Sequence, residues 1–228
     1  MSTVADRPAP AAGGFPQLGQ VAGSLWFLLL ALVYGRDLPA LVGAIPAASI
    51  PFAALAPVAS RGCTVAFFIT LAWLMLARPP AVARRSGLGT LLIALAGTYG
   101  VWVVAFLPQA PLPPTLTLLS AVTSLIGGAL IVFTVLRLGR SFSIAPQARE
   151  LVTRGPYSLV RHPLYAAEEI ALVGVAMHVV WYAAVPFLLV HLALQLRRMN
   201  YEEQLLGEVF PGYGAYARRT ARWVPGIW

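Results

Sequence analysis

The sequence predicts an all-α fold, a polytopic transmembrane helical bundle of about seven spans in which the second span is the least regular. The first observation is composition: 59% of residues are hydrophobic, 11% are charged, and the mean hydropathy is +0.77. A soluble domain usually carries about 25% charged residues, so this chain has too little polar surface to coat a water-soluble core. The second observation is that apolar runs of membrane-spanning length recur along its 228 residues.

The predicted spans are apolar segments separated by short breaks. Pro46, Pro51 and Pro57 fall in the second segment and predict a kinked or re-entrant span there. The breaks at 108–114 and 178–182 contain no arginine, which predicts two tight hairpins. The apolar segments lie at residues 18–34, 39–59, 62–77, 87–107, 115–136, 163–180 and 181–197.

Arginine placement predicts the orientation in the membrane. All 16 basic residues are arginines, and with seven spans 14 of them fall on one side, leaving Arg7 and Arg61 on the other. Basic residues favour the cytoplasmic side, so the C-terminal region is predicted to be cytoplasmic. The same clustering at the ends of apolar segments argues against a nucleic-acid-binding face, despite the net charge of +8. The lysine-free, Ala/Pro-rich composition favours a bacterial inner membrane.

Polar residues divide the chain into three predicted parts. Residues 1–17 lack the basic and apolar regions of a signal peptide and are predicted to form a flexible lead. Residues 18–86 are predicted to be accessory transmembrane helices, and 87–228 the functional core. Six of the eight acidic residues and all three histidines follow Leu136, so any chemistry is expected there. With the single Cys63, no intrachain disulfide or cysteine metal cluster is expected.

The first candidate group is Gly155-Pro156-Tyr157 followed by Arg161-His162-Pro163-Leu164-Tyr165. Gly-Pro predicts a turn, and proline suits the first position of a helix, so Pro163 is predicted to start the sixth span. The residues before it then lie at a helix N-terminus, where free backbone N–H groups favour a carboxylate. The alternative interpretation is an interfacial anchor, with tyrosine and arginine reaching the lipid headgroups.

Two further groups contain acidic residues. Glu168 and Glu169 lie inside an apolar segment, where acids usually face a cavity, and the alternative is an ion pair with Arg140 or Arg161. Arg198 and Glu202 are spaced i, i+4, which permits an ion pair, although a solvated helix end explains the group equally well. His178 and His191 are predicted to be packing or interface residues, and Gly127-Gly128 is predicted to permit close helix packing. Interfacial anchoring is predicted for the aromatic residues of the basic tail, Phe210, Tyr213, Tyr216, Trp223 and Trp228.

Several of these motifs follow one another in a fixed order. They are Arg140-Ser141-Phe142-Ser143, Glu150-Leu151-Val152-Thr153-Arg154-Gly155-Pro156-Tyr157, Arg161-His162-Pro163-Leu164-Tyr165, Arg198-x-x-x-Glu202-Glu203, Tyr213-x-x-Tyr216 and Arg222-Trp223-Val224-Pro225. The ordered set covers roughly residues 125–228. It resembles the isoprenylcysteine carboxyl methyltransferase family and its relatives, the integral-membrane phospholipid and thiol methyltransferases.

The resemblance implies S-adenosylmethionine as cofactor and assigns candidate roles to residues. Arg198 matches the arginine placed at the methyl acceptor and Glu202 matches a cofactor-contacting acid, so both are candidate catalytic residues. Glu168 and Glu169 depart from the isoprenylcysteine enzymes, which argues against a prenylated protein as acceptor; with Arg198 they are candidate substrate-binding residues. The family usually has a histidine where Arg149 stands. The implied cofactor-binding residues are Arg149, Glu150, Leu151, Val152, Tyr157, His162, Pro163, Leu164, Tyr165 and Glu202.

These residue types suit the charges of the implied cofactor. Glu202 can receive its ammonium, while His162 and the helix N-terminus can face its carboxylate. The rings of Tyr157 and Tyr165 suit the adenine and the sulfonium. The methyl acceptor implied is a lipophilic or small thiol, carboxylate or amine reached from the lipid bilayer. Two alternatives stay open: an NADPH-dependent membrane reductase of sterol-reductase-like architecture, and a non-enzymatic transport or partner subunit.

Overall fold

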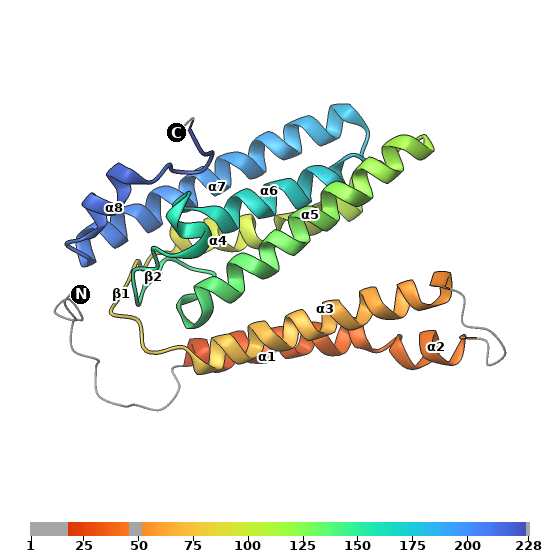
Figure 1. Ribbon diagram of the computed structural model, residues 1–228, viewed down its shortest axis with the longest axis horizontal. Helices are drawn as coiled ribbons and strands as arrows, with labels where there is room; N and C mark the ends of the chain where they lie inside the picture. Colours follow the sequence, from red (N-terminus) through yellow and green to blue (C-terminus); the bar gives the residue numbers. More distant parts are fainter. Residues whose placement is uncertain (1–17, 46–51, 227–228) are drawn as a thin grey trace. The chain divides into compact units, whose positions relative to one another are not determined.

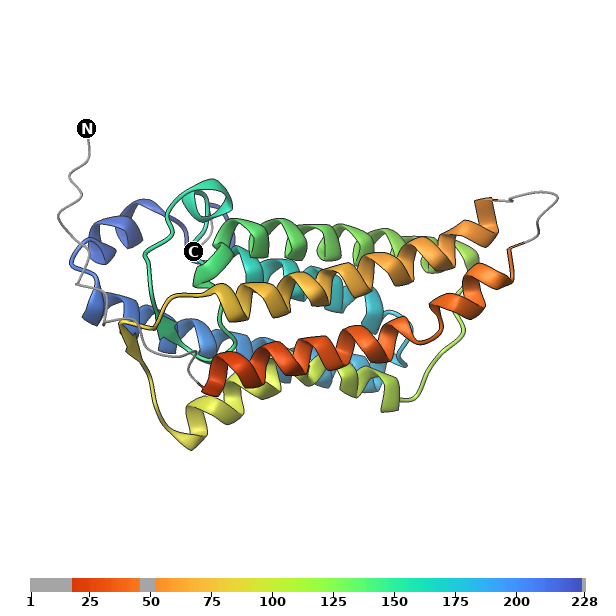
Figure 2. The same ribbon diagram turned by 90° about the horizontal axis from the view of Figure 1, so that it is seen from below.

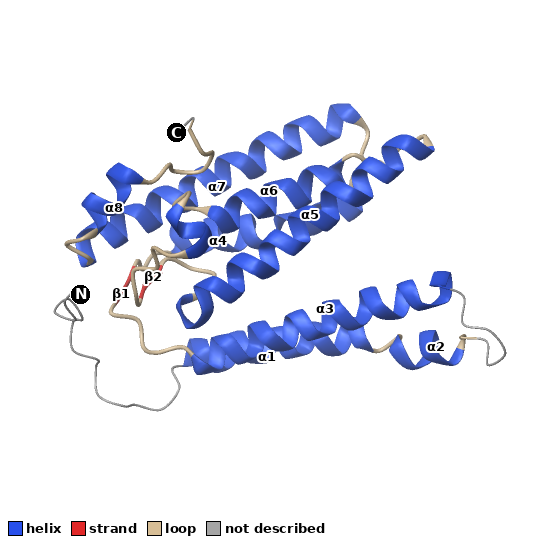
Figure 3. Ribbon diagram, in the orientation of Figure 1, coloured by secondary structure: helices blue, strands red, loops and turns tan. Residues whose placement is uncertain are grey.

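Helices make up nearly all of the regular structure (Figure 3), in a computed structural model that describes residues 18–45 and 52–226. The described residues divide into two compact units, 18–80 and 81–226. The first unit contains α1 (Leu18–Gly35), α2 (Leu38–Gly43) and α3 (Phe52–Ala77). The second contains the remaining helices and a two-stranded sheet, and it contains all of the candidate site residues.

In the first unit α1 packs along α3 through small and polar residues. Ser24 Oγ donates a hydrogen bond to the carbonyl of Ala72 at 2.9 Å, and Gln20 Nε2 donates to the carbonyl of Arg78 at 2.8 Å. A Cβ on Gly23 would lie 2.4 Å from the Cε of Met75, so the absence of a side chain permits this close approach. Such contacts suit helices in lipid, where apolar burial does not drive association.

The second predicted span, 39–59, is wrong as a single helix. Only its beginning forms α2, residues 46–51 lie outside the described residues, and from Phe52 the chain runs continuously through Arg61 and Gly62 to Ala77. A lone arginine followed by glycine does not end a helix, because glycine costs only about 1 kcal/mol there. The predicted break before residue 62 is therefore absent.

The second unit is an array of four long helices with short elements at one end. In order it comprises β1 (Ala83–Arg84), α4 (Leu88–Tyr99), the 3-10 helix η1 (Gly100–Phe106), α5 (Pro114–Leu138), η2 (Gly139–Ser141), β2 (Gln147–Ala148), η3 (Gly155–Ser158), α6 (Pro163–Ala176), α7 (Trp181–Val209) and α8 (Tyr213–Arg219). Figures 1 and 2 show α5, α6 and α7 running along one another, with α8 and the antiparallel β1–β2 pair at one end.

Small residues bring α5 and α6 into close contact. A Cβ on Gly127 would lie 2.3 Å from the backbone nitrogen of Ala171, and one on Gly174 would lie 2.4 Å from Ser124 Oγ. Ser120 Oγ donates to the carbonyl of Gly174 at 2.7 Å. The prediction of close packing is thus confirmed for Gly127, whereas a Cβ on Gly128 would meet nothing within 4 Å.

The two arginine-free breaks form neighbouring turns at the other end of the helices. The amide of Ala110 donates to the carbonyl of His178 at 2.7 Å, and the amide of Val180 donates to the carbonyl of Pro108 at 3.0 Å. An isolated bridge also joins Gln109 to Val179. The turns therefore satisfy each other's backbone groups, which lipid could not do.

Among the described residues, three helical stretches are long and apolar enough to cross a membrane. They are Leu18–Gly43, Leu88–Phe106 and Pro114–Ser141, and the apolar part of α3, Arg61–Ala77, is shorter. Large apolar side chains on these helices point outward: Leu25 is 60% exposed and Leu125 is 72% exposed. Apolar surface of this kind is stable against lipid rather than water. The predicted all-α polytopic membrane bundle is confirmed.

Candidate cofactor and acceptor pocket

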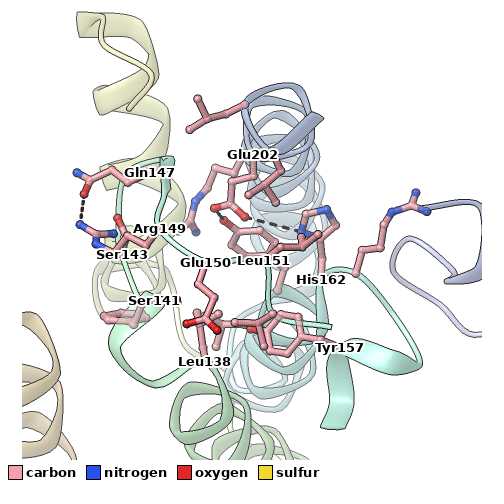
Figure 4. Close-up of a pocket in the computed structure, with 18 of the residues that line it drawn as sticks. Leu138, Ser141, Ser143, Gln147, Arg149, Glu150, Leu151, Tyr157, His162 and Glu202 are labelled. Carbon is pink, nitrogen blue, oxygen red and sulfur yellow. Dashed lines mark hydrogen bonds and ion pairs between the residues drawn. The ribbon is translucent and has the colours of Figure 1, made fainter. Parts of the chain in front are cut away.

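A pocket opens at the end of the second unit where α6, α7 and α8 meet the loops around β2 (Figure 4). It contains about 1020 Å³ of space, counting its solvent-open mouth. Small-molecule sites are concave and combine apolar walls with a few polar groups, and the lining of this pocket has that character. Its lining includes the predicted site residues Arg149, Glu150, Leu151, Val152, Tyr157, His162, Leu164, Tyr165, Glu168, Arg198 and Glu202.

The segment Arg149–Val152 forms one side of the pocket because the small sheet holds it there. After α5 ends, Gly139 adopts a φ of +54°, a conformation that favours glycine, and the chain reverses direction. β2 then pairs with β1 in antiparallel register, and the amide of Val82 donates to the carbonyl of Ala148 at 2.8 Å. Arg149 donates to the side-chain oxygen of Gln147 (Figure 4). The segment thus faces the helix ends across the pocket.

The turn from Gly155 to His162 forms the facing side. Gly155 has a φ of +64°, and Pro163 occupies the first position of α6 with His162 as N-cap, as predicted. Tyr157, His162 and Tyr165 are only 8%, 5% and 4% exposed. An interfacial anchor requires its polar tips in the headgroups, so that alternative is wrong for these three residues. Pro163 itself starts the helix without lining the pocket.

Residues 213–222, here called the C-terminal clamp, fix this turn from outside. Arg161 donates to the carbonyls of Ala217 and Thr220 at 2.6 and 2.7 Å, and its amide donates to the carbonyl of Ala221 at 2.8 Å. Tyr216 donates its hydroxyl hydrogen to the carbonyl of Tyr157 at 2.7 Å. The turn therefore depends on a segment about 60 residues later in the sequence.

Glu203 contacts several basic side chains behind the pocket. Its Oε1 lies 3.0 Å from Arg161 Nε, 3.0 Å from His162 Nε2 and 3.2 Å from Arg222 Nε. Burial alone raises the pKa of Glu203, but the hydrogen bond and charge of His162, with the two arginines, outweigh it and lower the pKa to about 2. Glu203 is thus a charged acceptor, and His162 Nε2 carries the hydrogen between them.

Glu202 is the acid that faces the pocket. Its Oε1 accepts a hydrogen bond from the hydroxyl of Tyr165, and its Oε2 lies 3.8 Å from His162 Nδ1 (Figure 4). The Glu202 side chain is 27% exposed, whereas that of His162 is 4% exposed. The two residues are close enough to contact a common ligand. The carboxylate therefore offers a negative charge to the pocket from a position fixed by its neighbours.

Arg198 and Glu168 meet in another part of the same pocket. Arg198 NH1 donates to Gln195 Oε1 at 2.7 Å and lies 3.6 Å from Glu168 Oε2, while Gln195 Nε2 donates to that same oxygen at 2.6 Å. The guanidinium lies over the ring of Tyr165, 4.6 Å from its centroid. Within the described residues Arg198 makes no ion pair with Glu202, because the side chain turns toward Glu168 instead.

Glu169 lies outside the pocket lining, one residue from Glu168 but in a different polar cluster. Its Oε1 lies 2.6 Å from His191 Nδ1, and His191 Nε2 donates to the carbonyl of Gly97 at 3.0 Å. A carbonyl only accepts, so Nε2 carries a hydrogen and one proton is shared between Nδ1 and Glu169. The cluster joins α4, α6 and α7. The alternative pairing of the two acids with Arg140 or Arg161 is wrong.

Several pocket residues were missed by sequence reasoning. Tyr213 and Tyr216 line the pocket and are 7% and 4% exposed, so interfacial anchoring is wrong for them, as it is for the 8%-exposed Phe210. Trp228 lies outside the described residues. The spacing of the two tyrosines, one turn of a short helix, was the available signal. No such signal marked Thr98, which also lines the pocket, or Gln195, which bonds to two lining residues, because uncharged polar residues in apolar helices are common packing groups.

Part of the chain that forms this pocket matches a known protein family. Residues 118–208 match the model of the isoprenylcysteine carboxyl methyltransferase (ICMT) family. The resemblance seen in the sequence is confirmed for that segment, which contains α6, most of α5 and most of α7. The matched segment ends before the C-terminal clamp.

Two curated proteins are similar to part of the chain. The nickel-cobalt-cadmium resistance protein NccN of Alcaligenes xylosoxydans xylosoxydans is 35% identical over 82 residues, which are 36% of this chain and 38% of that protein. The cobalt-zinc-cadmium resistance protein CzcN of Cupriavidus metallidurans is 36% identical over 78 residues, 34% of this chain and 36% of that protein. The chain therefore matches less than two fifths of the length of either relative.

Proposed function

We propose that this chain, whose residues 118–208 match a family of membrane methyltransferases, transfers a methyl group from S-adenosylmethionine to a lipophilic or small acceptor. The observation that carries the proposal is one pocket lined by both the Glu150–Val152 segment and the polar side chains of His162, Tyr165 and Glu202. The family match supports methyl transfer in general, and the pocket supports a charged nucleoside as donor. The residues around Arg198 are those proposed to contact the reacting atom of the acceptor.

The residues of the pocket fit S-adenosylmethionine. The buried hydroxyl of Tyr213 has no hydrogen-bond partner within the described part of the chain, although it lines the pocket, as does Thr98 Oγ1. Unpartnered buried polar atoms are costly, and a polar ligand would satisfy them. The positive ammonium of the cofactor matches Glu202, and its carboxylate matches the free backbone N–H groups in the first turn of α6, which begins at Pro163.

When bound, the cofactor supplies a methyl group attached to a positively charged sulfur. The chain's own residues then act by position and charge. The aromatic ring of Tyr157 suits the adenine, and Arg198, which lies over the Tyr165 ring, orients the acceptor. Holding two reactants in line is itself a large part of such catalysis. Glu202 and Arg198 are therefore the proposed catalytic residues.

The orientation proposed for the molecule puts this pocket at the cytoplasmic face of a bacterial inner membrane. None of the arginines after residue 80 falls in the two turns at 108–113 and 177–180, which lie at the end of the helices opposite the pocket (Figures 1 and 2). The positive-inside tendency then puts the pocket where S-adenosylmethionine is made. The acceptor would enter from the bilayer or the cytoplasm.

The names of the two relatives concern resistance to metal ions, and the proposal does not rest on them. Within the described residues there is no group of three or more histidine, cysteine, aspartate or glutamate side chains that could hold a metal ion. The proposal rests instead on the family match and on the pocket.

The test is calorimetric binding of S-adenosylmethionine to detergent-purified protein. We expect Glu202→Gln to weaken binding by about 10- to 100-fold, because a charge-assisted hydrogen bond is worth about 1.5–3 kcal/mol. Glu208→Gln is the matched control, since Glu208 is exposed on the same helix and outside the pocket. No binding at millimolar cofactor, or binding of NADPH in its place, would overturn the proposal.

A further inference from the structure

The part of the pocket around Arg198, where the acceptor is proposed to bind, contains a pair of opposite charges and not a lone cation. The Arg198 side chain is only 4% exposed, and Glu168 lies 3.6 Å from it with 24% of its side chain exposed. Gln195, which is fully buried, contacts both residues and fixes their separation. Both charged groups line the pocket, so an acceptor beside Arg198 also lies beside Glu168.

This pair discriminates between classes of acceptor. A carboxylate needs a cation that is not already neutralised, and it would lie beside the like charge of Glu168. An alkylammonium would suffer the corresponding repulsion from Arg198, which is fixed in place by Gln195 and by the Tyr165 ring. An aliphatic thiol enters uncharged, because even the more acidic cysteine thiol has a pKa of about 8.5. The uncharged thiol is the acceptor that meets neither repulsion.

A thiol must lose its proton to attack, and Glu168 is the group placed to take it. Within the described residues both polar contacts of Glu168 use Oε2, which leaves Oε1 for a ligand. Other groups are engaged: Glu169 and His191 bind each other, and Glu202 accepts from Tyr165. Burial and the charge of Glu202 raise the pKa of Tyr157 well above its usual value, so its hydroxyl stays protonated.

We propose that Glu168 is the general base of an S-methylation whose acceptor is a lipophilic thiol, with Arg198 stabilising the thiolate. The proton of the S–H bond passes to Oε1 of Glu168, and the sulfur's electron pair forms the new S–CH₃ bond. The bond between the methyl group and the cofactor's sulfonium breaks, and its electron pair stays on that sulfur as S-adenosylhomocysteine. The proton leaves Glu168 for water at the pocket mouth. This inference rests on the proposed function.

The test uses three probes of equal chain length: decanethiol, decylamine and decanoate. Binding of each to the full-length protein in detergent is measured by calorimetry in the presence of S-adenosylhomocysteine, and methyl transfer is measured with radiolabelled S-adenosylmethionine. We expect methylation of decanethiol only. In Glu168→Gln, turnover of decanethiol should fall on the order of 100-fold, the usual worth of a general base. Decanoate should bind on the order of tenfold tighter, because Arg198 loses its compensating charge.

Tighter decanoate binding separates a charge role from a structural one, since a damaged pocket would weaken every probe. Glu208→Gln should match the wild type in all assays. If Glu168→Gln does not fold, Glu168→Asp keeps a carboxylate and should retain measurable decanethiol turnover. Binding of S-adenosylmethionine with equal methylation of decanoate, or unchanged thiol turnover in Glu168→Gln, would overturn this inference alone. Failure of the wild type to bind S-adenosylmethionine would overturn the proposed function as well.

Discussion

At the scale of single residues, Glu203 and Glu202 show how adjacent acids acquire different roles. Glu203 contacts Arg161, His162 and Arg222 behind the pocket, whereas Glu202 faces the pocket beside Tyr165. One helical position rotates a side chain by about 100°, which follows from 3.6 residues per turn and separates the two environments. Glu203 therefore stabilises the fold, and Glu202 remains available to a ligand.

Glu203→Gln is predicted to remove an acid-sensitive part of the protein's stability. The folded pKa of about 2 lies below the ordinary 4.5, so the carboxylate stabilises the fold above pH 4.5. That contribution is lost as the pH falls from about 4.5 to 2. We expect the variant to be less stable at pH 7 by on the order of 2 kcal/mol. Thermal unfolding in detergent between pH 2 and 7 measures both effects.

In that experiment the wild type should lose stability through this pH range, while Glu203→Gln should lack that part of the decline. Glu208→Gln, exposed on the same helix, should follow the wild type. Two parallel pH curves for the wild type and Glu203→Gln would contradict the assignment.

At the scale of elements, the contact between α5 and α6 depends on missing side chains. The Cβ position of Gly127 is 2.3 Å from the Ala171 backbone, and backbone atoms cannot rotate aside. Neighbouring Gly128 faces open space, although the sequence does not distinguish the two glycines. Because α6 carries Glu168 and α5 leads into the Arg149–Val152 segment, this contact also positions two sides of the pocket.

Gly127→Leu is predicted to separate the two helices and destabilise the protein by about 1–3 kcal/mol or more, the usual cost of overpacking. Gly128→Ala is the matched control and should be neutral or slightly stabilising, since alanine favours a helix by about 1 kcal/mol over glycine. Thermal unfolding in detergent and calorimetric cofactor binding report stability and pocket geometry. Equal melting temperatures for the two variants would show that the close contact does not limit stability.

At the scale of the whole molecule, the sequence predicted best those features that depend on neighbouring residues in the chain. Apolar length predicted α1, α5 and α6 within a few residues, and Pro163 marked the start of α6. The predicted segment 87–107 is α4 continued by η1, and α7 continues past the predicted end at residue 197 to Val209. The second span was wrong because the chain was divided at the lone Arg61, whereas α3 continues through this residue from Phe52 to Ala77. The prediction of side-chain partners failed where the partners come from distant segments: Arg198 pairs with Glu168, and His191 pairs with Glu169.

The candidate pocket was anticipated only in part for the same reason. Ordered motifs pointed to the residues of one segment or one turn, such as Glu150–Val152 and Tyr157, and these do line the pocket. Gln195 carries no charge and belongs to no motif, yet it fixes both Arg198 and Glu168. The sequence pattern predicted Tyr213 and Tyr216 to be interfacial anchors, but both side chains, which belong to the C-terminal clamp, are buried. Packing between segments that are far apart in the sequence determines whether such residues are buried or exposed, and the pattern of residues along the chain does not reveal that packing.

The membrane orientation is predicted from the arginines and can be tested with single cysteines. Cys63 is the one native cysteine, so Cys63→Ser provides a clean background. Ser86→Cys lies near the pocket end, and Pro111→Cys lies in the turn at the other end; both positions are exposed. A membrane-impermeant maleimide should label Pro111→Cys from outside intact cells and Ser86→Cys only in inside-out vesicles. The reverse pattern would contradict a cytoplasmic pocket.

The C-terminal clamp imposes an order on how the molecule is made. α4 to α7 leave the ribosome before residues 213–222, and until then Arg161 has no Ala217 or Thr220 carbonyl to bind. A nascent chain halted before Gly212 would have inserted its helices while one wall of the pocket was still missing. Under the proposed function, binding of the cofactor would therefore follow completion of the C-terminal clamp, and unfinished chains would not consume the methyl donor.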